Sequence, residues 1–178
     1  SGEAAWDKTF SFFTAFESID RYVQSVIGAS DFTSQPGGAR LLTGSVSGDE
    51  IEAQLQYIIG GSVNVDPTLR LDRSSRMRSE FFILTSDGII GLMTGYILGV
   101  NAGGTGSFSD GYGFKISNTS LLGLSVNNST ENVTSSLATL VYGTTIFVEA
   151  IYVPSKSITF YVNGELKAKI LDGLPRTT

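Results

Sequence analysis

The sequence predicts an all-β fold, a jelly-roll sandwich of two antiparallel sheets. Three observations support this prediction. The 178 residues include 21 Gly but only 4 Pro, a composition that suits short strands joined by tight turns. Alternating apolar and polar stretches recur along the chain, and the turn signals between them are spaced by about 8 to 12 residues, which is typical of sandwiches and jelly rolls. The length fits one domain with a sizeable core.

The composition also excludes several kinds of site. The sequence has no Cys and no His, so it has no disulfide, no thiolate metal ligand and none of the commonest general base. Carboxylates, Tyr and Lys remain for acid-base chemistry. The net charge of -5 argues against nucleic acid as a partner, because phosphate binding requires a basic face. The apolar runs are far shorter than the roughly 20 residues of a membrane helix, so we expect no membrane span.

The N-terminal segment, residues 1–30, is predicted to pack on a jelly-roll domain of residues 31–178, with the whole chain a single domain. A run of apolar residues with alternating spacing of 4 and 3 predicts an amphipathic helix: Phe12, Phe16, Ile19, Val23 and Val26. The stretch TFSFF, however, is aromatic and β-branched, which favours a strand. We expect a strand through Phe16 followed by a loop, with the helix as the alternative.

The clearest strand is Glu50 to Ile59, EIEAQLQYII, where apolar and polar residues alternate without interruption. Further strands are predicted over residues 77–85, 91–100, 113–118, 121–127 and 145–153, each bounded by Gly, Asn, Asp or Ser.

A hairpin is predicted over Ser157 to Ile170, SITFYVNGELKAKI, where two alternating runs meet at Asn163-Gly164. A two-residue turn places Val162 opposite Glu165 and mixes apolar with polar residues on both faces. A three-residue loop that ends in a left-handed Gly164 instead pairs Phe160 with Leu166, in a glycine bulge. Since a one-residue slip exposes the whole apolar set, the pattern predicts the bulged register.

This C-terminal pattern, from Val153-Pro154 through the hairpin to Leu174-Pro175, resembles the concanavalin A-like lectin and glucanase superfamily. FESID at 16–20, ARLLTGSVSGDEIEAQL at 39–55 and GYGFKIS at 111–117 extend the resemblance over most of the chain. The motifs are structural, so the resemblance implies the jelly roll and says little about the ligand. The general character of the sequence is also similar to that of phage or virus structural proteins, and this resemblance implies an extracellular or virion-surface location. Family members continue past the Leu-Pro into another sheet strand, whereas this sequence stops at Thr178. The N-terminal segment fills that place, or the sequence is cut there, or another chain completes the edge. Because an uncovered edge invites strand pairing, we expect a homo-oligomer formed through it.

The candidate glycan-binding residues are Arg76, Arg78, Glu80, Tyr112, Lys115, Glu149 and Tyr161. On a strand, Arg76, Arg78 and Glu80 project from one face, and such a row can bind an acidic polysaccharide through guanidinium–carboxylate pairs. The alternative is that this row neutralises Glu50 and Glu52 on a neighbouring strand. Glu149 lies within apolar TTIFVEAIYV, so it is expected to be partly buried, either with a raised pKa or as a structural residue.

No catalytic residue is predicted. Arg78-Ser79-Glu80 resembles the start of the Arg-Ser-Glu-Leu-Arg signature of alginate lyases, but Phe82 takes the place of the final Arg and the chain has no His. The Glu-x-Asp-x-x-Glu strand of retaining glucanases, with its two closely spaced carboxylates, is also missing. A lyase or hydrolase that uses Glu80 or Glu149 with Tyr112 or Tyr161 stays open as an alternative.

No cofactor is predicted, with a structural calcium as the alternative. Oxygen-bearing turns occur at Asp87-Gly88, Asp110-Gly111 and Asp172-Gly173, but none has EF-hand spacing. Four glycosylation sequons begin at Asn118, Asn127, Asn128 and Asn132. We interpret them as a polar loop whose side chains suit hydrogen bonding to sugar hydroxyls at the rim of the fold.

These observations predict a non-catalytic carbohydrate-binding or adhesion module of an extracellular or virion structure. Its expected partner is a glycan or cell-surface polysaccharide, contacted through the concave face or the rim loops. The alternatives are a glycan-active enzyme and a purely structural assembly domain without a ligand.

Overall fold

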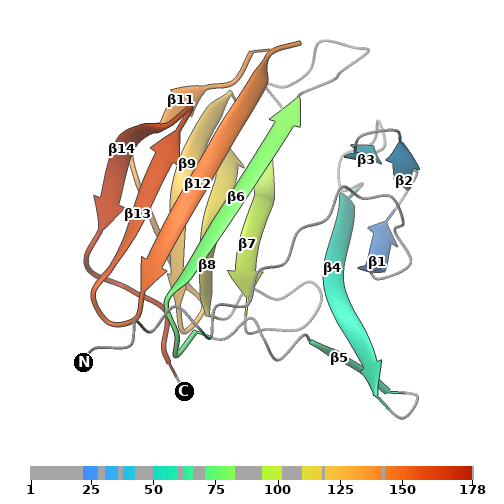
Figure 1. Cartoon of the computed structure of the whole chain (residues 1–178), viewed down its shortest axis with the longest axis horizontal. Coiled ribbons are helices and arrows are strands. Elements are labelled where there is room, and N and C mark those ends of the chain that lie inside the picture. The colour runs from blue at the N-terminus through green and yellow to red at the C-terminus, as the bar shows by residue number, and fades with distance from the viewer. Residues whose placement is uncertain are drawn as a thin grey trace, which may run out of the picture. The chain divides into compact units, whose positions relative to one another are not determined.

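A computed structural model describes the backbone of residues 22–27, 31–35, 38–42, 50–59, 62–65, 71–82, 94–101, 110–117, 119–141 and 143–177. Side chains are described within 71–81, 110–117, 119–141 and 143–177. Every regular element in these ranges is a β-strand, and the paired strands are all antiparallel (Figure 1). For the described part of the chain, the predicted all-β class is confirmed.

The chain forms two compact units, Ser1–Thr68 and Leu69–Thr178. The strands of the first unit are β1 (Tyr22–Ile27), β2 (Asp31–Gln35), β3 (Gly38–Leu42), β4 (Glu50–Ile59) and β5 (Ser62–Val65). They form a three-stranded sheet of order β1-β4-β5 and the pair β2-β3. The predicted division at residue 30 of a single domain stays a prediction.

The predicted strand Glu50–Ile59 is confirmed with the same bounds. Residues 22–27, predicted as a loop, instead form β1, with Tyr22 opposite Leu55 and Ile27 opposite Glu50. The segment YVQSVI contains three β-branched residues, which suit a pleated surface once a partner strand is available. The predicted strand through Phe16 lies outside the described residues.

The second unit holds two sheets. One has the order β14-β13-β12-β6, with β6 (Ser75–Phe82), β12 (Thr145–Val153), β13 (Ser157–Val162) and β14 (Glu165–Ile170). The other has the order β10-β9-β8-β7, with β7 (Thr94–Asn101), β8 (Gly111–Ser117), β9 (Ser120–Asn127), β10 (Thr130–Val133) and the short β11 (Ala138–Thr139) paired to β9. The bounds of β12 match the prediction, and those of β6, β7, β8 and β9 differ from it by one to three residues.

The two sheets of this unit form two packed layers with a hydrophobic core between them (Figure 1). Tyr112 of β8 stacks on Tyr152 of β12 with ring centroids 4.9 Å apart. Phe114 meets Phe160 edge-on, with centroids 5.5 Å apart and rings inclined by 75°, a geometry that aromatic quadrupoles favour. These contacts join residues of opposite sheets, so this unit is a β-sandwich.

Gly123 of β9 makes space for one of these rings. A Cβ atom at this position would lie 2.7 Å from Cε2 of Phe160, which is closer than carbon atoms pack. Glycine therefore lets the backbone of β9 approach the ring directly.

The predicted register of the C-terminal hairpin is wrong. Val162 pairs with Glu165 across a two-residue turn, in which Asn163 and Gly164 have φ of 51° and 81°. Two positive φ angles indicate a type I′ turn, whose twist matches that of the flanking strands. Asn163 also pins the turn to β12, because its backbone N–H donates to Phe147 O at 2.8 Å and its Oδ1 accepts from Phe147 N at 3.0 Å.

A two-residue turn alone would place apolar residues of β13 opposite polar residues of β14, and a bulge in β14 restores the pairing of like residues. Phe160 pairs with Ala168 and Tyr161 with Leu166, so Lys167 is the extra residue of β14. Ile170 is thereby placed on the buried side with Phe160, and only Leu166 is left 62% exposed. The sequence offers two solutions, a bulge at the turn or a bulge inside the strand, and the structure uses the second.

Within the described strands, β14 lies at one end of its sheet. It carries exposed Lys167 and Lys169, and Lys167 is the bulged residue. Edge lysines and bulges are features that oppose pairing with another chain. The expected homo-oligomer through an open edge stays a prediction, and β14 is poorly suited to form it.

Candidate functional site

The outer face of the four-stranded sheet, the side turned away from the core, collects five of the seven candidate residues. The register places Arg78 opposite Glu149 and Glu149 opposite Tyr161. Arg76 and Glu80 lie two residues to either side of Arg78 on β6 and so share this face. Residues from three strands therefore meet here, although β6 and β12 are far apart in the sequence.

Arg76, Glu149 and Arg78 form one ion-paired group, which we call the Arg–Glu–Arg cluster. Glu149 Oε2 accepts from Arg76 Nε at 2.8 Å and lies 2.7 Å from Arg76 Nη2. The same oxygen accepts from Arg78 Nε. The Glu149 side chain is only 8% exposed, whereas those of Arg76 and Arg78 are 51% and 54% exposed. A buried carboxylate thus orients two guanidiniums whose side chains are about half exposed.

The pKa of Glu149 lies below its usual value. Burial alone raises it, but the hydrogen bonds from Arg78 and Arg76, together with their charges, outweigh that effect. Of the two alternatives for Glu149, the raised pKa is therefore wrong, and its two ion pairs agree with a structural residue. An ionised carboxylate held by two guanidiniums is a poor proton donor, so the cluster orients charge and does not supply a general acid.

The described partner of the two arginines is not one that the sequence suggested. The alternative that the row on β6 neutralises Glu50 and Glu52 stays a prediction, because those side chains lie outside the described ones. Among the described side chains, the partner is Glu149 on the adjacent strand β12. Cross-strand neighbours on one face are the natural pairs in a sheet.

The surroundings of the cluster are partly apolar. Half-buried Phe147, Ile151, Val153, Thr159 and Tyr161 lie on the same face. At the paired positions of this face, the charged residues are Arg76, Arg78 and Lys169, against Glu80 and Glu149, while the bulged Lys167 forms an ion pair with Glu165. Three positive and two negative charges give a net charge of +1 on this face, while the whole chain carries -5.

Tyr112 does not belong to this face. Its side chain is fully buried in the core, and its hydroxyl lies 2.6 Å from Ser75 Oγ. Burial raises its pKa to about 12. A buried ring makes no contact with a glycan, so Tyr112 is corrected to a core residue. The alternation in GYGFKIS, which groups Tyr112 with Phe114 and Ile116, is the sequence signal that identifies it as one.

Lys115 lies on the other sheet. It alternates with buried Tyr112 and Phe114 along β8, so its side chain is on the face of that sheet turned away from the core. There it forms an ion pair with Glu131. The structure therefore does not bring Lys115 together with the Arg–Glu–Arg cluster.

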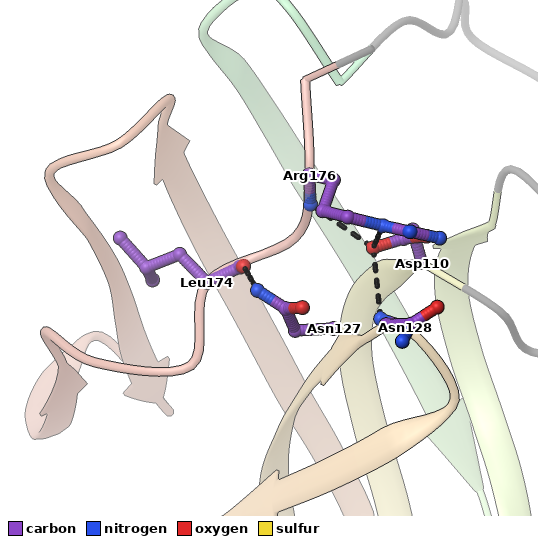
Figure 2. A network of polar contacts seen from close by, with 5 residues as sticks. All are labelled: Asp110, Asn127, Asn128, Leu174 and Arg176. Carbon is purple, nitrogen blue, oxygen red and sulfur yellow. Dashed lines mark hydrogen bonds and ion pairs between the residues drawn. The ribbon is translucent and has the colours of Figure 1, made fainter.

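A second polar network, which the sequence did not reveal, centres on Asp110 (Figure 2). Its carboxylate accepts from Arg176 Nη2 at 2.6 Å and from the backbone N–H groups of Arg176 at 3.0 Å and Asn128 at 3.1 Å. The side-chain hydrogen bond from Arg176 is the largest cause of the lowered pKa of Asp110, and it outweighs the effect of burial. Asp110 was a candidate calcium ligand, but both of its carboxylate oxygens here accept hydrogen bonds from Arg176, and one also accepts a hydrogen bond from Asn128.

The asparagine-rich turn continues this network. Asn127 Nδ2 donates to Leu174 O at 2.6 Å (Figure 2), and Asn132 Nδ2 donates to Asp172 O at 2.8 Å. Ser125 Oγ donates to Gly173 O at 2.6 Å. These side chains fasten residues 172–176 to β9 and β10. Two of the predicted sequon asparagines are thus structural here, whereas Asn128 is exposed in the turn and Asn118 lies outside the described residues.

Two shallow hollows lie on the described surface. The larger, of about 330 Å³, lies between β10 and β14 and is lined by residues 132–135 and 168–172. The smaller, of about 100 Å³, lies beside residues 138–141 and 144–146. Neither includes a residue of the Arg–Glu–Arg cluster, whose two Arg side chains are about half exposed.

Among the described residues, no group of three or more Asp or Glu side chains is arranged to hold a metal ion. No helix in those ranges is long and apolar enough to cross a membrane.

Comparison of the chain with protein-family models, with curated proteins and with solved structures found no match.

Proposed function

We propose that the chain is a non-catalytic carbohydrate-binding or adhesion module that contacts glycans through the outer face of the four-stranded sheet. The proposal includes a concanavalin A-like jelly-roll connection of the strands. It also includes an extracellular or virion-surface location, since glycans of cell surfaces are found there.

The observation that carries the proposal is the Arg–Glu–Arg cluster next to Tyr161 on the outer face of the four-stranded sheet. Guanidinium groups supply several N–H donors in a fixed plane, which suits oxygen-rich ligands. A Tyr ring supplies a flat apolar surface with a polar tip. Together they provide hydrogen bonding and ring contact, which are the two needs of sugar recognition.

Binding without catalysis is favoured by the protonation state of the site. Glu149 is ionised and engaged by two guanidiniums, so it lacks the proton that a general acid must donate. Tyr112, a partner in the enzymatic alternative, is buried in the core. The remaining pair on this face, Glu80 and Tyr161, gives the enzymatic alternative its only support.

The experiment is affinity electrophoresis of the whole chain in gels that contain neutral or acidic polysaccharides. Reducing ends and the absorbance of unsaturated uronates are monitored in parallel. We expect retardation by at least one polysaccharide without product. Product formation would overturn the non-catalytic part of the proposal, and free migration in every gel would leave the structural assembly domain as the better account.

A variant pair localises the binding face. Tyr161→Ala removes a half-buried ring of the outer face, so we expect retardation to weaken several-fold. Val141→Ala trims an exposed apolar residue of the β11–β12 connection and is expected to migrate like the parent chain. Equal effects of the two substitutions would place binding elsewhere.

A further inference from the structure

We propose that the ligand of this face is a polysaccharide of uronic acids, and that its carboxylates bind the exposed sides of Arg76 and Arg78. This inference rests on the proposed function, because it names the class of glycan for the same face. It assigns Glu149 as a positioning residue that holds both guanidiniums.

The charge of the cluster is the first argument. Two guanidiniums and one ionised carboxylate leave a net charge of +1, which one uronate carboxylate neutralises. The face as a whole is also +1, whereas the chain is -5. An acidic polymer is repelled by most of this molecule, so a local positive charge decides where it binds.

The geometry of the donors is the second argument. Both arginines contact the same oxygen of Glu149, so their guanidiniums lie next to each other. Each guanidinium has five N–H donors, and Arg78 uses Nε for Glu149. Because each side chain is about half exposed, donors are left for a ligand. Guanidinium and carboxylate groups are both planar, and they form bidentate pairs with two parallel hydrogen bonds.

Pre-organisation is the third argument. An arginine side chain that is not held by other residues loses rotamer freedom when it binds a ligand. Here the buried carboxylate of Glu149 has already fixed both arginine side chains, so less entropy is lost on binding. Tyr161 lies in the same cross-strand row as Arg78 and Glu149, so a sugar chain that runs across the strands can contact the ring and the guanidinium together.

The test compares polygalacturonate with its fully methyl-esterified form, using the whole chain and isothermal titration calorimetry at low ionic strength. The two polymers share the same sugar backbone and differ in the charge of the carboxyl group. We expect binding to polygalacturonate that weakens as salt is added, and at least tenfold weaker binding to the ester.

Three variants test which residues supply the positive charge that binds polygalacturonate. Arg78→Gln removes one positive charge and is expected to weaken binding to polygalacturonate at least fivefold. Glu80→Gln removes an exposed negative charge of the same face and is expected to tighten binding two- to threefold, a gain that loss of folding does not produce. Lys156→Gln, in the exposed β12–β13 turn, removes one positive charge off the face and is expected to change affinity less than twofold.

The outcomes separate the inference from the proposed function. Equal binding of polygalacturonate and its ester, or equal effects of Arg78→Gln and Lys156→Gln, would overturn the inference and leave a glycan-binding module for neutral sugars. Failure of every polysaccharide to bind would overturn both. Discrimination against the ester, together with tighter binding by Glu80→Gln, supports the inference.

Discussion

Arg176 binds Asp110 with its backbone and its side chain at once. The backbone N–H lies 3.0 Å from Oδ1, and Nη2 lies 2.6 Å from Oδ2 (Figure 2). Asp110 immediately precedes β8, in the sheet opposite to the one that ends with β14. This pair therefore ties the C-terminal segment to the five-stranded sheet.

We predict that Asp110→Asn lowers the free energy of unfolding by about 1 to 3 kcal/mol, because it weakens hydrogen bonds that involve a charged group. Urea denaturation at pH 7 measures this change. Asp172→Asn is the matched control, since Asp172 is an exposed acid of the same segment and its substitution is expected to have little effect. Equal stability of the two variants would contradict a structural role for the Asp110–Arg176 pair.

The stability of the chain is expected to fall in acid. The pKa values of Glu149 and Asp110 are lowered in the folded state from 4.5 and 3.8. The unfolded chain therefore takes up protons first, and the stabilisation is present above the unfolded values and lost as the pH falls through the folded ones. Unfolding free energies measured in urea should be nearly constant down to about pH 5 and decrease below about pH 4.5.

The variants Glu149→Gln and Asp110→Asn test the source of this dependence. Each is expected to be less stable than the parent at pH 7 and to show a shallower decline in acid, because one of the two groups no longer titrates. If Glu149→Gln declines as steeply as the parent, the Arg–Glu–Arg cluster does not stabilise the folded state.

Gly123→Ala is expected to destabilise the sandwich by about 1 to 3 kcal/mol, the usual cost of overpacking a core. The new Cβ meets Phe160 Cε2 at 2.7 Å, so the ring or the strand has to move. Phe160→Leu removes the obstructing ring edge and is expected to relieve part of this cost in the double variant. A double-mutant cycle in urea measures the coupling, and strict additivity of the two changes would contradict the close contact.

Gly164→Ala tests the turn of the C-terminal hairpin. No atom lies within 4 Å of a Cβ built at this position, and its φ is +81°, so the expected cost of about 1 to 2 kcal/mol arises from the left-handed backbone alone. Asn163→Gly is the companion variant. Glycine adopts the φ of 51° seen for Asn163 without strain, so any cost of this substitution reports the loss of the hydrogen bond from Phe147 N to Asn163 Oδ1. Thermal unfolding followed by circular dichroism measures both, and a neutral Gly164→Ala would contradict the type I′ turn.

Much of the strand content was predictable, because alternation is local. Glu50–Ile59 and Thr145–Val153 have their predicted bounds, since long alternating runs between turn residues leave little ambiguity. The hairpin register was not predictable. A bulge at Gly164 and a bulge at Lys167 both keep the apolar residues of the hairpin on one face. The structure has the bulge at Lys167, and in this register Asn163 forms hydrogen bonds with Phe147 of β12.

The candidate site was predictable in part. The sequence placed Arg76, Arg78 and Glu80 on one face of a strand, because β-strand geometry fixes side-chain direction. It marked Glu149 as a buried acid but supplied no partner for it, because the pairing of β6 with β12 joins segments about seventy residues apart. That distance in sequence also hid the Asp110–Arg176 pair.

By itself, the sequence determined the all-β class, the position of most strands of the second unit and the strand face that Arg76, Arg78 and Glu80 share. These properties depend on composition and on a period of two residues, which are local. Only the tertiary structure decided that Glu149 joins Arg76 to Arg78, that Tyr112 is buried against Tyr152, and that Lys115 lies on a different sheet. Each of these depends on which strands are neighbours, and strand neighbours are chosen by the packing of the whole core.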